Sequence, residues 1–212
     1  MLFSDRANGP AETIVAELRD YPEWRRGRTR YGIWMIPVEE PALLAYLRDA
    51  RRRLADLLHP CPRRQPHLTL FVCGFESAAR VADDDFTPAQ LRRQIDLLGR
   101  DDGAAGALPL GRPDSFASAA FVPVGDPEGR LAGWRARLAR AAREVRRAPY
   151  VPHITLGLYR RRVDAATVRA RLAGLEAPPV PLPVGELHYA TYEARVPQGA
   201  LSSRCRLRLR GG

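Results

Sequence analysis

The sequence contains no lysine, so its 34 basic residues are all arginine and outnumber the 24 acidic residues by ten. The missing lysine excludes enzymes that form a covalent lysyl-nucleotide intermediate, as one type of ATP-dependent ligase does. Arginine is a fixed bidentate donor that suits phosphate. The charge therefore favours nucleic acid or a phosphorylated small molecule as a partner. The alternative is a solvated basic surface in a protein from a GC-rich genome.

Cysteine and histidine are also scarce. The three cysteines, at positions 61, 73 and 205, form no Cys-x-x-Cys pair. An odd number without that spacing argues against a disulfide framework and a zinc site, and it favours a reducing compartment. We therefore expect a cytoplasmic protein without a zinc site. We also expect no cofactor. Histidine occurs four times in 212 residues, and two of these residues lie in matching sequence frames.

Long apolar runs are missing as well. No run approaches the ~20 residues of a bilayer-spanning helix, and the first residues do not resemble a secretory signal, so we expect no membrane contact. A turn-rich basic stretch at residues 21–28 predicts that residues 1–28 are an N-terminal extension and linker. The length then suits one domain over residues 29–212, which we expect to be monomeric.

Hydrophobic periodicity predicts strands and helices that follow one another along the chain. The predicted strands cover residues 31–37, 67–75, 108–116, 119–124, 151–159, 185–194 and 201–209, and the predicted helices cover residues 11–19, 41–57, 87–98, 131–145 and 164–175. The order of strands and helices recurs in a weaker form in the second half, which indicates an internal duplication. The predicted class is α+β, with helices on one side of the sheets.

One five-residue pattern occurs in both halves. Residues 66–70 read Pro-His-Leu-Thr-Leu, and residues 152–156 read Pro-His-Ile-Thr-Leu. The two histidines, His67 and His153, are therefore 86 residues apart. A single His-x-Thr segment in a strand is usually structural. Two copies in matching frames of a histidine-poor chain favour a shared functional site instead.

Each copy presents one imidazole and one hydroxyl on the same side of a strand, because residues two apart point to the same face. His67 and Thr69 form one such pair, and His153 and Thr155 form the other. Together they suit phosphodiester cleavage without a metal. A neutral histidine accepts a proton from water or a ribose hydroxyl, and a protonated histidine donates one to the leaving oxygen. The threonines bind the non-bridging oxygens.

The motifs and their surroundings resemble the 2H phosphoesterase superfamily, in particular its 2′-5′ RNA ligase-like (LigT-like) branch and the related cyclic phosphodiesterases. The resemblance covers about residues 30–209 and includes the apolar strand at 31–37 and the Phe-Val-Cys-Gly-Phe run at 71–75. It implies a bilobal, pseudo-twofold α+β fold, with two antiparallel sheets flanking a central groove, helices on the outside and no metal. The active-site roles that it implies fall on His67, Thr69, His153 and Thr155.

Beyond the motifs, strand alternation places Phe71 on the face of the first motif and Tyr159 on that of the second. Either ring could stack on a base at the rim of the groove, with core packing as the alternative. Arg160 follows the second motif and is a candidate for binding a distal phosphate. His59 and His188 are expected to be structural.

The sequence thus predicts a metal-independent phosphodiesterase that acts on 2′,3′-cyclic phosphates or 2′-5′ linkages in RNA or nucleotides. Microscopic reversibility would allow ATP-independent RNA ligation as the reverse reaction. Two alternatives remain open at this point. One is a non-catalytic module that binds RNA or phosphonucleotides. The other is a 2H enzyme that acts on an ADP-ribose cyclic phosphate or a cyclic-oligonucleotide signal.

Overall fold

The computed structural model describes residues 1–60, 63–99, 105–146 and 148–210. The strands are β1 (Arg30–Pro37), β2 (His67–Glu76), β3 (Asp85–Phe86), β4 (Gly106–Leu108), β5 (Asp114–Ser115), β6 (Ala119–Pro123), β7 (His153–Leu158), β8 (Leu182–Val184), β9 (Glu186–Glu193) and β10 (Ser202–Arg208). The helices are α1 (Pro22–Arg25), α2 (Pro41–Arg53), α3 (Pro88–Gly99), α4 (Arg130–Ala139) and α5 (Ala165–Ala173). The predicted α+β class is confirmed.

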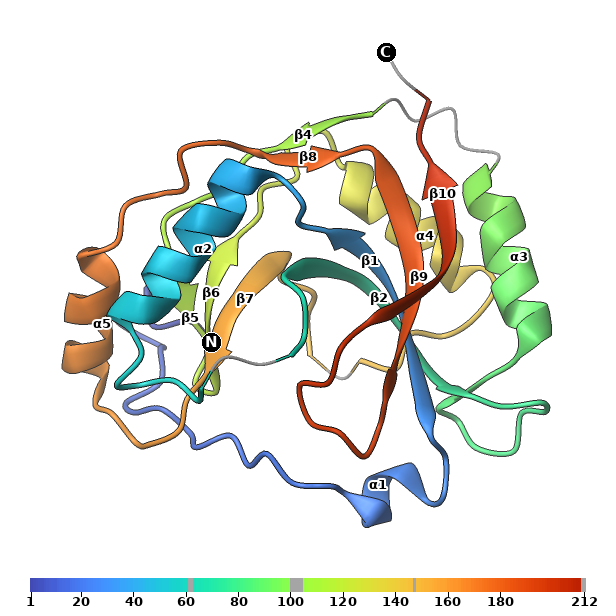
Figure 1. Ribbon diagram of the computed structural model, residues 1–212, viewed down its shortest axis with the longest axis horizontal. Helices are drawn as coiled ribbons and strands as arrows, with labels where there is room; N and C mark the ends of the chain where they lie inside the picture. Colours follow the sequence, from blue (N-terminus) through green and yellow to red (C-terminus); the bar gives the residue numbers. More distant parts are fainter. Residues whose placement is uncertain (61–62, 100–104, 147, 211–212) are drawn as a thin grey trace.

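The large sheet has eight strands in the order β10-β9-β1-β2-β7-β6-β5, with β3 beside β2, while β4 and β8 form a separate pair. It divides into two lobes (Figure 1). The strands from β10 to β2 carry α3 and α4 on their outside, and the strands from β7 to β5 carry α2 and α5. In the described part of the chain, the lobes join where Leu68 of β2 pairs with Ile154 of β7. The two antiparallel sheets that the sequence predicts are therefore joined into one sheet. The join lies at the middle residue of each His-x-Thr motif.

The two motif strands have equivalent partners in the same register. β2 pairs with β1 so that His67 lies opposite Pro37, and β7 pairs with β6 so that His153 lies opposite Pro123. Each position in the first pair is 86 residues before its counterpart in the second. Such a shared register is the structural pattern of an internal duplication.

The helices of the two halves are exchanged between the lobes. α2 leads toward the first motif but packs against β7, and α4 leads toward the second motif but packs against β2. The chain after each helix crosses over in the same way. The N–H of His59 donates to the carbonyl of Leu158 (2.9 Å), and the N–H of Val145 donates to that of Val72 (3.0 Å). Each motif strand is therefore held by the segment that leads into the other motif.

Most helix boundaries follow from local sequence. Thr87 and Gln90 form a capping box at α3, since the side chain of each accepts a hydrogen bond from the backbone N–H of the other. Asp164 caps α5 by accepting from the Thr167 N–H. The helix predicted over residues 131–145 is too long, because α4 ends at Ala139 and the following chain turns toward β2.

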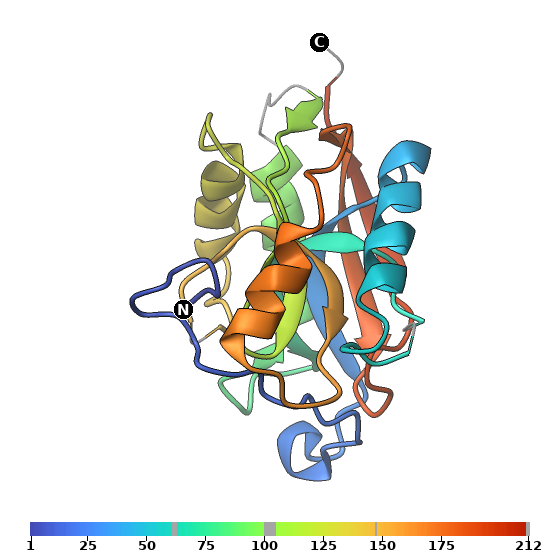
Figure 2. The ribbon, with the colours of Figure 1, turned by 90° about the vertical axis from the view of Figure 1, so that its left-hand side faces the viewer.

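The N-terminal segment packs along the second lobe, and the helix predicted over residues 11–19 is wrong. Phe3 is fully buried. The N–H of Thr13 donates to the carbonyl of Val163 (2.9 Å). The backbone of this segment therefore forms hydrogen bonds with another part of the same chain instead of the hydrogen bonds of a helix. The chain then crosses to α1 beside the first lobe, along the lower end of the molecule in both views (Figures 1 and 2).

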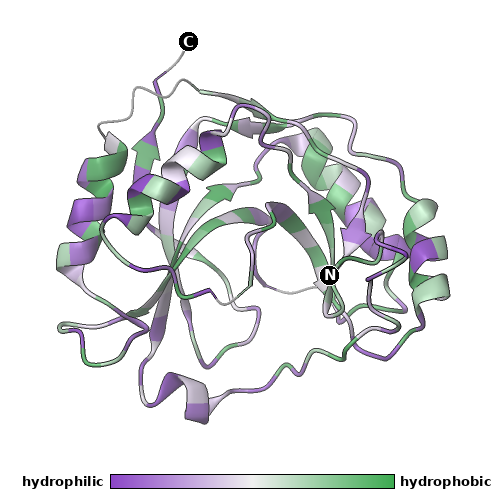
Figure 3. Cartoon of the chain, turned by 180° about the vertical axis from the view of Figure 1, so that it is seen from behind, coloured by the Kyte–Doolittle hydropathy of each residue, from purple (hydrophilic) through white to green (hydrophobic). Residues whose placement is uncertain are grey.

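The core lies between the sheet and its covering helices. Figure 3 shows mostly hydrophobic central strands and helices that mix hydrophobic with hydrophilic residues, as amphipathic helices do. Trp34 is fully buried, and its Nε1–H donates to Gln94 (2.8 Å). A smaller apolar cluster lies on the other face of β1, where Tyr31 and Met35 are buried. Both faces of β1 therefore pack against apolar side chains, whereas the motif side chains of β2 and β7 are only half-buried.

Candidate active site

The four motif side chains lie on one face of the central sheet. Leu68 and Ile154 are fully buried on the opposite face, whereas the four motif residues are half-buried. Antiparallel register around the Leu68–Ile154 pair sets His67 next to Thr155, and it sets Thr69 next to His153. The motifs are therefore neighbours within a sheet, with the two histidines on a diagonal.

Each imidazole is oriented by a backbone carbonyl two residues earlier. Nδ1 of His67 lies 2.8 Å from the oxygen of Gln65, and Nδ1 of His153 lies 2.7 Å from the oxygen of Val151. A carbonyl oxygen only accepts, so Nδ1 carries the proton in both rings. This tautomer leaves the Nε2 of each neutral histidine as the nitrogen that can accept a proton from a ligand.

Burial keeps both histidines neutral at pH 7. Burial lowers the pKa of His67 to about 4, and the nearby positive charge of Arg64 lowers it further. Burial also lowers the pKa of His153, with Arg146 acting in the same direction. The hydrogen bonds to the backbone carbonyls oppose these shifts without cancelling them. Phe116 and Phe121 pack against the ring of His153 at 5.1 and 5.2 Å between centroids.

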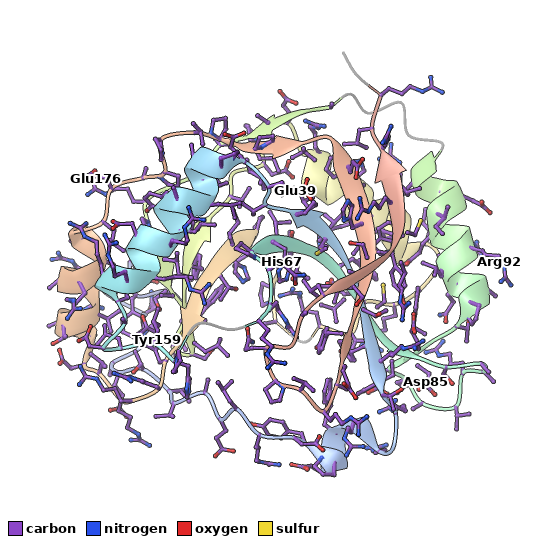
Figure 4. All side chains as sticks on the ribbon, viewed as in Figure 1. Glu39, His67, Asp85, Arg92, Tyr159 and Glu176 are labelled. Carbon is purple, nitrogen blue, oxygen red and sulfur yellow. The ribbon has the colours of Figure 1, made fainter. Side chains whose placement is uncertain are left out.

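A cavity of about 490 Å³ opens over this face, and three of the four motif residues, His67, Thr69 and Thr155, line it. His153 is not among the lining residues of this cavity. His67 lies near the middle of the molecule (Figure 4). Three positive charges, Arg51, Arg63 and Arg64, also line the cavity. Its volume lies within the ordinary range for small-molecule and cofactor sites. An anionic ligand of nucleotide size therefore suits the charge and the dimensions of this cavity.

Phe71 and Tyr159 do not reach the cavity, so their predicted role in base stacking is wrong in this structure. Both are 1% exposed. A β-bulge explains each error: the register shifts at Leu70 opposite β1, and it shifts again at Leu156 opposite β6. One extra residue reverses the alternation of the strand, so the rings turn into the core. The Tyr159 hydroxyl is hydrogen-bonded to a buried serine hydroxyl at 2.7 Å.

Arg160 also lies away from the cavity lining. Its Nε–H donates to the carbonyl of Asp56 (3.2 Å), in the chain just after α2. The side chain of Arg160 is exposed, and its contact with a distal phosphate stays a prediction. Arg51, Arg63 and Arg64 line the cavity instead. Arg63 and Arg64 were detectable from sequence as charges that directly precede the first motif, whereas Arg51 is brought in by the packing of α2.

Other parts of the wall come from segments that sequence patterns did not connect with the site. Residues 196–199 line the cavity, and Leu18 contributes from the N-terminal segment. The chain just before the first motif contacts residues 196–199, because Arg64 Nε–H donates to the carbonyl of Gly199 (3.2 Å). These contacts are long-range in sequence, so no local motif indicates them.

The other two histidines make structural contacts, as expected. His59 Nε2 lies 2.7 Å from the carbonyl of Ala16, although the residue also lines the cavity. His188 is buried between Ser203 and Glu186, at 2.9 Å from each. Among the described residues, no group of three or more His, Cys, Asp or Glu side chains is arranged to hold a metal ion. None of the described helices has the length and apolar character needed to cross a membrane.

The chain belongs to the 2′-5′ RNA ligase superfamily, whose family model matches residues 38–195. The matched range contains both His-x-Thr motifs, and the N-terminal segment lies outside it. This membership, together with the fold, identifies an enzyme of the 2H phosphoesterase type with a LigT-like architecture.

Solved structures agree with that architecture. LigT from E. coli without ligand has 19% sequence identity and a TM-score of 0.60, over 87% of this chain and 99% of LigT. The same protein complexed with 3′-AMP has 17% identity and a TM-score of 0.55, over 86% of this chain and 99% of LigT. A conserved protein of unknown function from Agrobacterium tumefaciens has 15% identity and a TM-score of 0.58, over 90% of each chain. A comparison with curated protein sequences gave no match.

Proposed function

We propose that the protein is a metal-independent phosphodiesterase that opens 2′,3′-cyclic phosphates or cleaves 2′-5′ linkages in RNA or nucleotides. The observation that carries the proposal is the register of the motif strands, which brings two imidazoles and two hydroxyls to one sheet face. The complex of the similar E. coli LigT with 3′-AMP is consistent with a nucleotide-sized ligand. Residues 29–212 would form the catalytic domain of a cytoplasmic monomer.

In the proposed reaction, water attacks the phosphorus opposite the leaving ribose oxygen. One histidine accepts the proton of the water at Nε2, while the other, protonated at Nε2, donates to the leaving oxygen. The bond from water to phosphorus forms as the bond from phosphorus to the ribose oxygen breaks. Because a pseudo-twofold relation connects His67 and His153, the side on which the leaving oxygen lies decides which of them is the acid.

The substrate itself supplies the charge that the acid needs. Burial favours the neutral form of both histidines, and a phosphodiester anion beside them raises the pKa of the nearer imidazole. In the described part of the chain, no hydrogen bond to protein involves the hydroxyl of Thr69 or Thr155, so both can donate to non-bridging oxygens. With a 5′-hydroxyl in the place of water, the same arrangement would join a cyclic phosphate to that hydroxyl without ATP, because the bond from the 5′-oxygen to phosphorus forms as one bond from phosphorus to a ribose oxygen breaks.

The test is hydrolysis of a nucleoside 2′,3′-cyclic phosphate in EDTA, with the product identified by phosphorus NMR. His67→Ala and His153→Ala should each reduce kcat by about 10²–10⁴-fold. His188→Gln is the control, because His188 is buried outside both motifs and its ring contacts Ser203 and Glu186. Turnover that survives both alanine substitutions would reject the assignment, and loss of turnover in EDTA would reject metal independence.

The alternatives predict different results in the same assay. A binding module would show salt-dependent affinity for RNA with no turnover. An enzyme for an ADP-ribose cyclic phosphate or a cyclic-oligonucleotide signal would prefer those compounds to nucleoside cyclic phosphates when all are compared at one salt concentration. Either outcome would replace the proposed substrate class.

A further inference from the structure

The internal duplication is broken in the two segments that lead into the motifs. Positions 86 apart remain equivalent there, because the two backbone hydrogen bonds by which these segments cross over match at that spacing. Leu58 therefore corresponds to Glu144, and Arg64 corresponds to Tyr150. Both differences change charge, so the surroundings of the two motifs are not electrostatically equivalent.

Beside the second motif, the charged groups have partners within the protein. Arg135 and Arg146 both contact the carboxylate of Glu144, at 2.5 and 3.3 Å. The guanidinium of Arg135 lies over the ring of Tyr150, 3.6 Å from its centroid. The Tyr150 hydroxyl donates to the carbonyl of Thr69 (3.0 Å). This segment therefore carries its own carboxylate, and its tyrosine is used to hold the neighbouring strand.

Beside the first motif, the equivalent positions leave a positive charge without a carboxylate. Leu58 is buried and apolar at the position that corresponds to Glu144. Within the described part of the chain, Arg64 forms no ion pair. Its Nε–H donates to the carbonyl of Gly199 (3.2 Å), and its guanidinium lies over the ring of Tyr192, 4.0 Å from the centroid. These contacts orient the guanidinium, but neither partner carries a negative charge.

The charge of Arg64 is also partly withdrawn from water. Burial lowers the pKa of its guanidinium. Burial is the main cause of the lowered pKa of His67 as well, and the nearby charge of Arg64 acts on that imidazole in the same direction. A charge that is partly buried is costly unless an opposite charge or further hydrogen bonds offset the lost water. Because Arg64 lines the same cavity as His67 and Thr69, a bound anion is the partner that this charge lacks.

Arg51 and Arg63 line the same cavity, but the protein does not orient them. Within the described residues, the side chain of neither forms a hydrogen bond or an ion pair. A guanidinium that is already held in one orientation loses less side-chain freedom when it binds phosphate than a mobile one does. Arg64 is therefore the arginine of the cavity that is arranged to bind one defined oxygen.

We propose that Arg64 binds a non-bridging oxygen of the reacting phosphate beside His67, as a third phosphate contact in addition to the hydroxyls of Thr69 and Thr155. The proposal rests on the proposed function, because it concerns the same site, and it adds a residue that belongs to neither motif. The bound phosphate supplies the negative charge that the segment before the first motif lacks. Charge-assisted hydrogen bonds from the guanidinium then hold the phosphate against the sheet.

The experiment measures the binding of inorganic phosphate by isothermal titration calorimetry, which needs no turnover. Arg64→Gln should raise the Kd for phosphate by about tenfold to a hundredfold, the usual loss for a hydrogen bond to a charged group. Arg64→Lys should fall between Arg64→Gln and the wild type, because lysine keeps the charge without the planar pair of donors. The control is Arg92→Gln, an equal change of charge at an exposed position on the outer side of α3 (Figure 4).

The control variant should bind phosphate within about twofold of the wild type. Unchanged affinity in Arg64→Gln, or an equal loss in Arg92→Gln, would overturn the proposal.

Thermal unfolding separates a phosphate contact from a purely structural role. Phosphate should raise the Tm of the wild type, since a ligand that binds the folded state stabilises it, and should raise that of Arg64→Gln much less. Without phosphate the two proteins should have similar Tm values, because the removed charge has no carboxylate partner. A large fall in Tm without phosphate in both Arg64→Gln and Arg64→Lys would mean that Arg64 only holds residues 196–199, and it would overturn the proposal.

Kinetics distinguishes this proposal from the proposed function. With a nucleoside 2′,3′-cyclic phosphate, Arg64→Gln should lower kcat/KM by about tenfold or more. Equal kcat/KM in the wild type and Arg64→Gln would reject the contact and leave the function standing. Phosphate binding that depends on Arg64, in a wild type that turns over no substrate, would reject the function and leave the contact standing.

Discussion

Glu144 holds the bulged part of the first motif strand, and its replacement gives a quantitative test of that role. The carboxylate accepts from Arg135 at 2.5 Å and from the N–H of Val72 at 3.1 Å. Arg135 in turn donates to the carbonyl of Leu70 at 2.6 Å. These backbone groups border the bulge. The Arg135–Glu144 pair therefore supplies hydrogen bonds to β2 where the regular pairing with β1 is interrupted. Glu144→Gln keeps an oxygen for Val72 and removes the negative charge beside Arg135.

The expected loss follows from the burial of the pair. The side chains of Arg135 and Glu144 are 18% and 13% exposed. Removing one partner of a buried ion pair typically costs about 3–5 kcal/mol, and the remaining solvent contact argues for a loss of about 3 kcal/mol. In a chain of this size each kcal/mol shifts Tm by roughly 2–4 °C, so Tm should fall by roughly 6–12 °C.

The loss should also depend on pH. Burial alone raises the pKa of Glu144, but the hydrogen bonds from Arg135 and the Val72 N–H outweigh it, and the net pKa is lowered. A carboxyl with a lowered pKa contributes its full stability above the unfolded pKa of about 4.3 and loses it as pH falls through the folded pKa. The difference between wild type and Glu144→Gln should therefore shrink at acidic pH.

Urea unfolding at pH 7 and at pH 3.5 measures both effects. Glu128→Gln is the matched control, because Glu128 is exposed just before α4, and its effect should stay within about 0.5 kcal/mol. A loss below about 1 kcal/mol for Glu144→Gln at pH 7 would place the pair among ordinary surface salt bridges. That result would refute the inference that it holds the strand.

Three further predictions concern catalysis and packing. Because burial lowers the pKa of both His67 and His153, kcat/KM should be highest below pH 6.5 and fall about tenfold per pH unit at higher pH, and a flat pH–rate profile up to pH 8 would contradict this. Tyr159→Phe removes the hydrogen bond to Ser115 and should lower the free energy of unfolding by about 1 kcal/mol with little change in kcat/KM; a large kinetic loss at unchanged stability would point to substrate contact. Phe3→Ala should destabilise the protein by about 3–5 kcal/mol in urea unfolding, since Phe3 is fully buried, and a negligible effect would mean that the N-terminal segment is dispensable for the fold.

The sequence predicts the face of the motifs correctly because that prediction needs only two residues of regular strand. His67 and Thr69 are two apart, and the strand is regular between them. Extending the same alternation to Phe71 fails, because the bulge at Leu70 lies between Thr69 and Phe71. A leucine is apolar on either face, so nothing in the residue types marks the extra position. The identical error at Tyr159 has the identical cause.

Long-range packing accounts for most of the remaining differences. The apolar spacing of residues 11–19 is compatible with a helix, yet the N–H of Ala16 bonds to the carbonyl of Tyr159 (2.9 Å), and tertiary contacts override local propensity. Arg51 reaches the cavity because α2 packs against β7. Local hydrophobic periodicity indicates neither contact, so both can be identified only from the folded structure.

The exchange of helices between the lobes also constrains how the protein folds. Because α2 covers β7 and α4 covers β2, neither half of the chain can bury its own motif strand, and the lobes must assemble together. Closing a loop of 86 residues instead of ten costs about 2 kcal/mol more in chain entropy before any contact compensates it. Folding should accordingly be slow, in the range of milliseconds to seconds for folds rich in non-local strand pairs. Fragments 1–99 and 106–212, expressed separately, should remain incomplete until they associate, so that catalytic activity would itself report the meeting of the two halves.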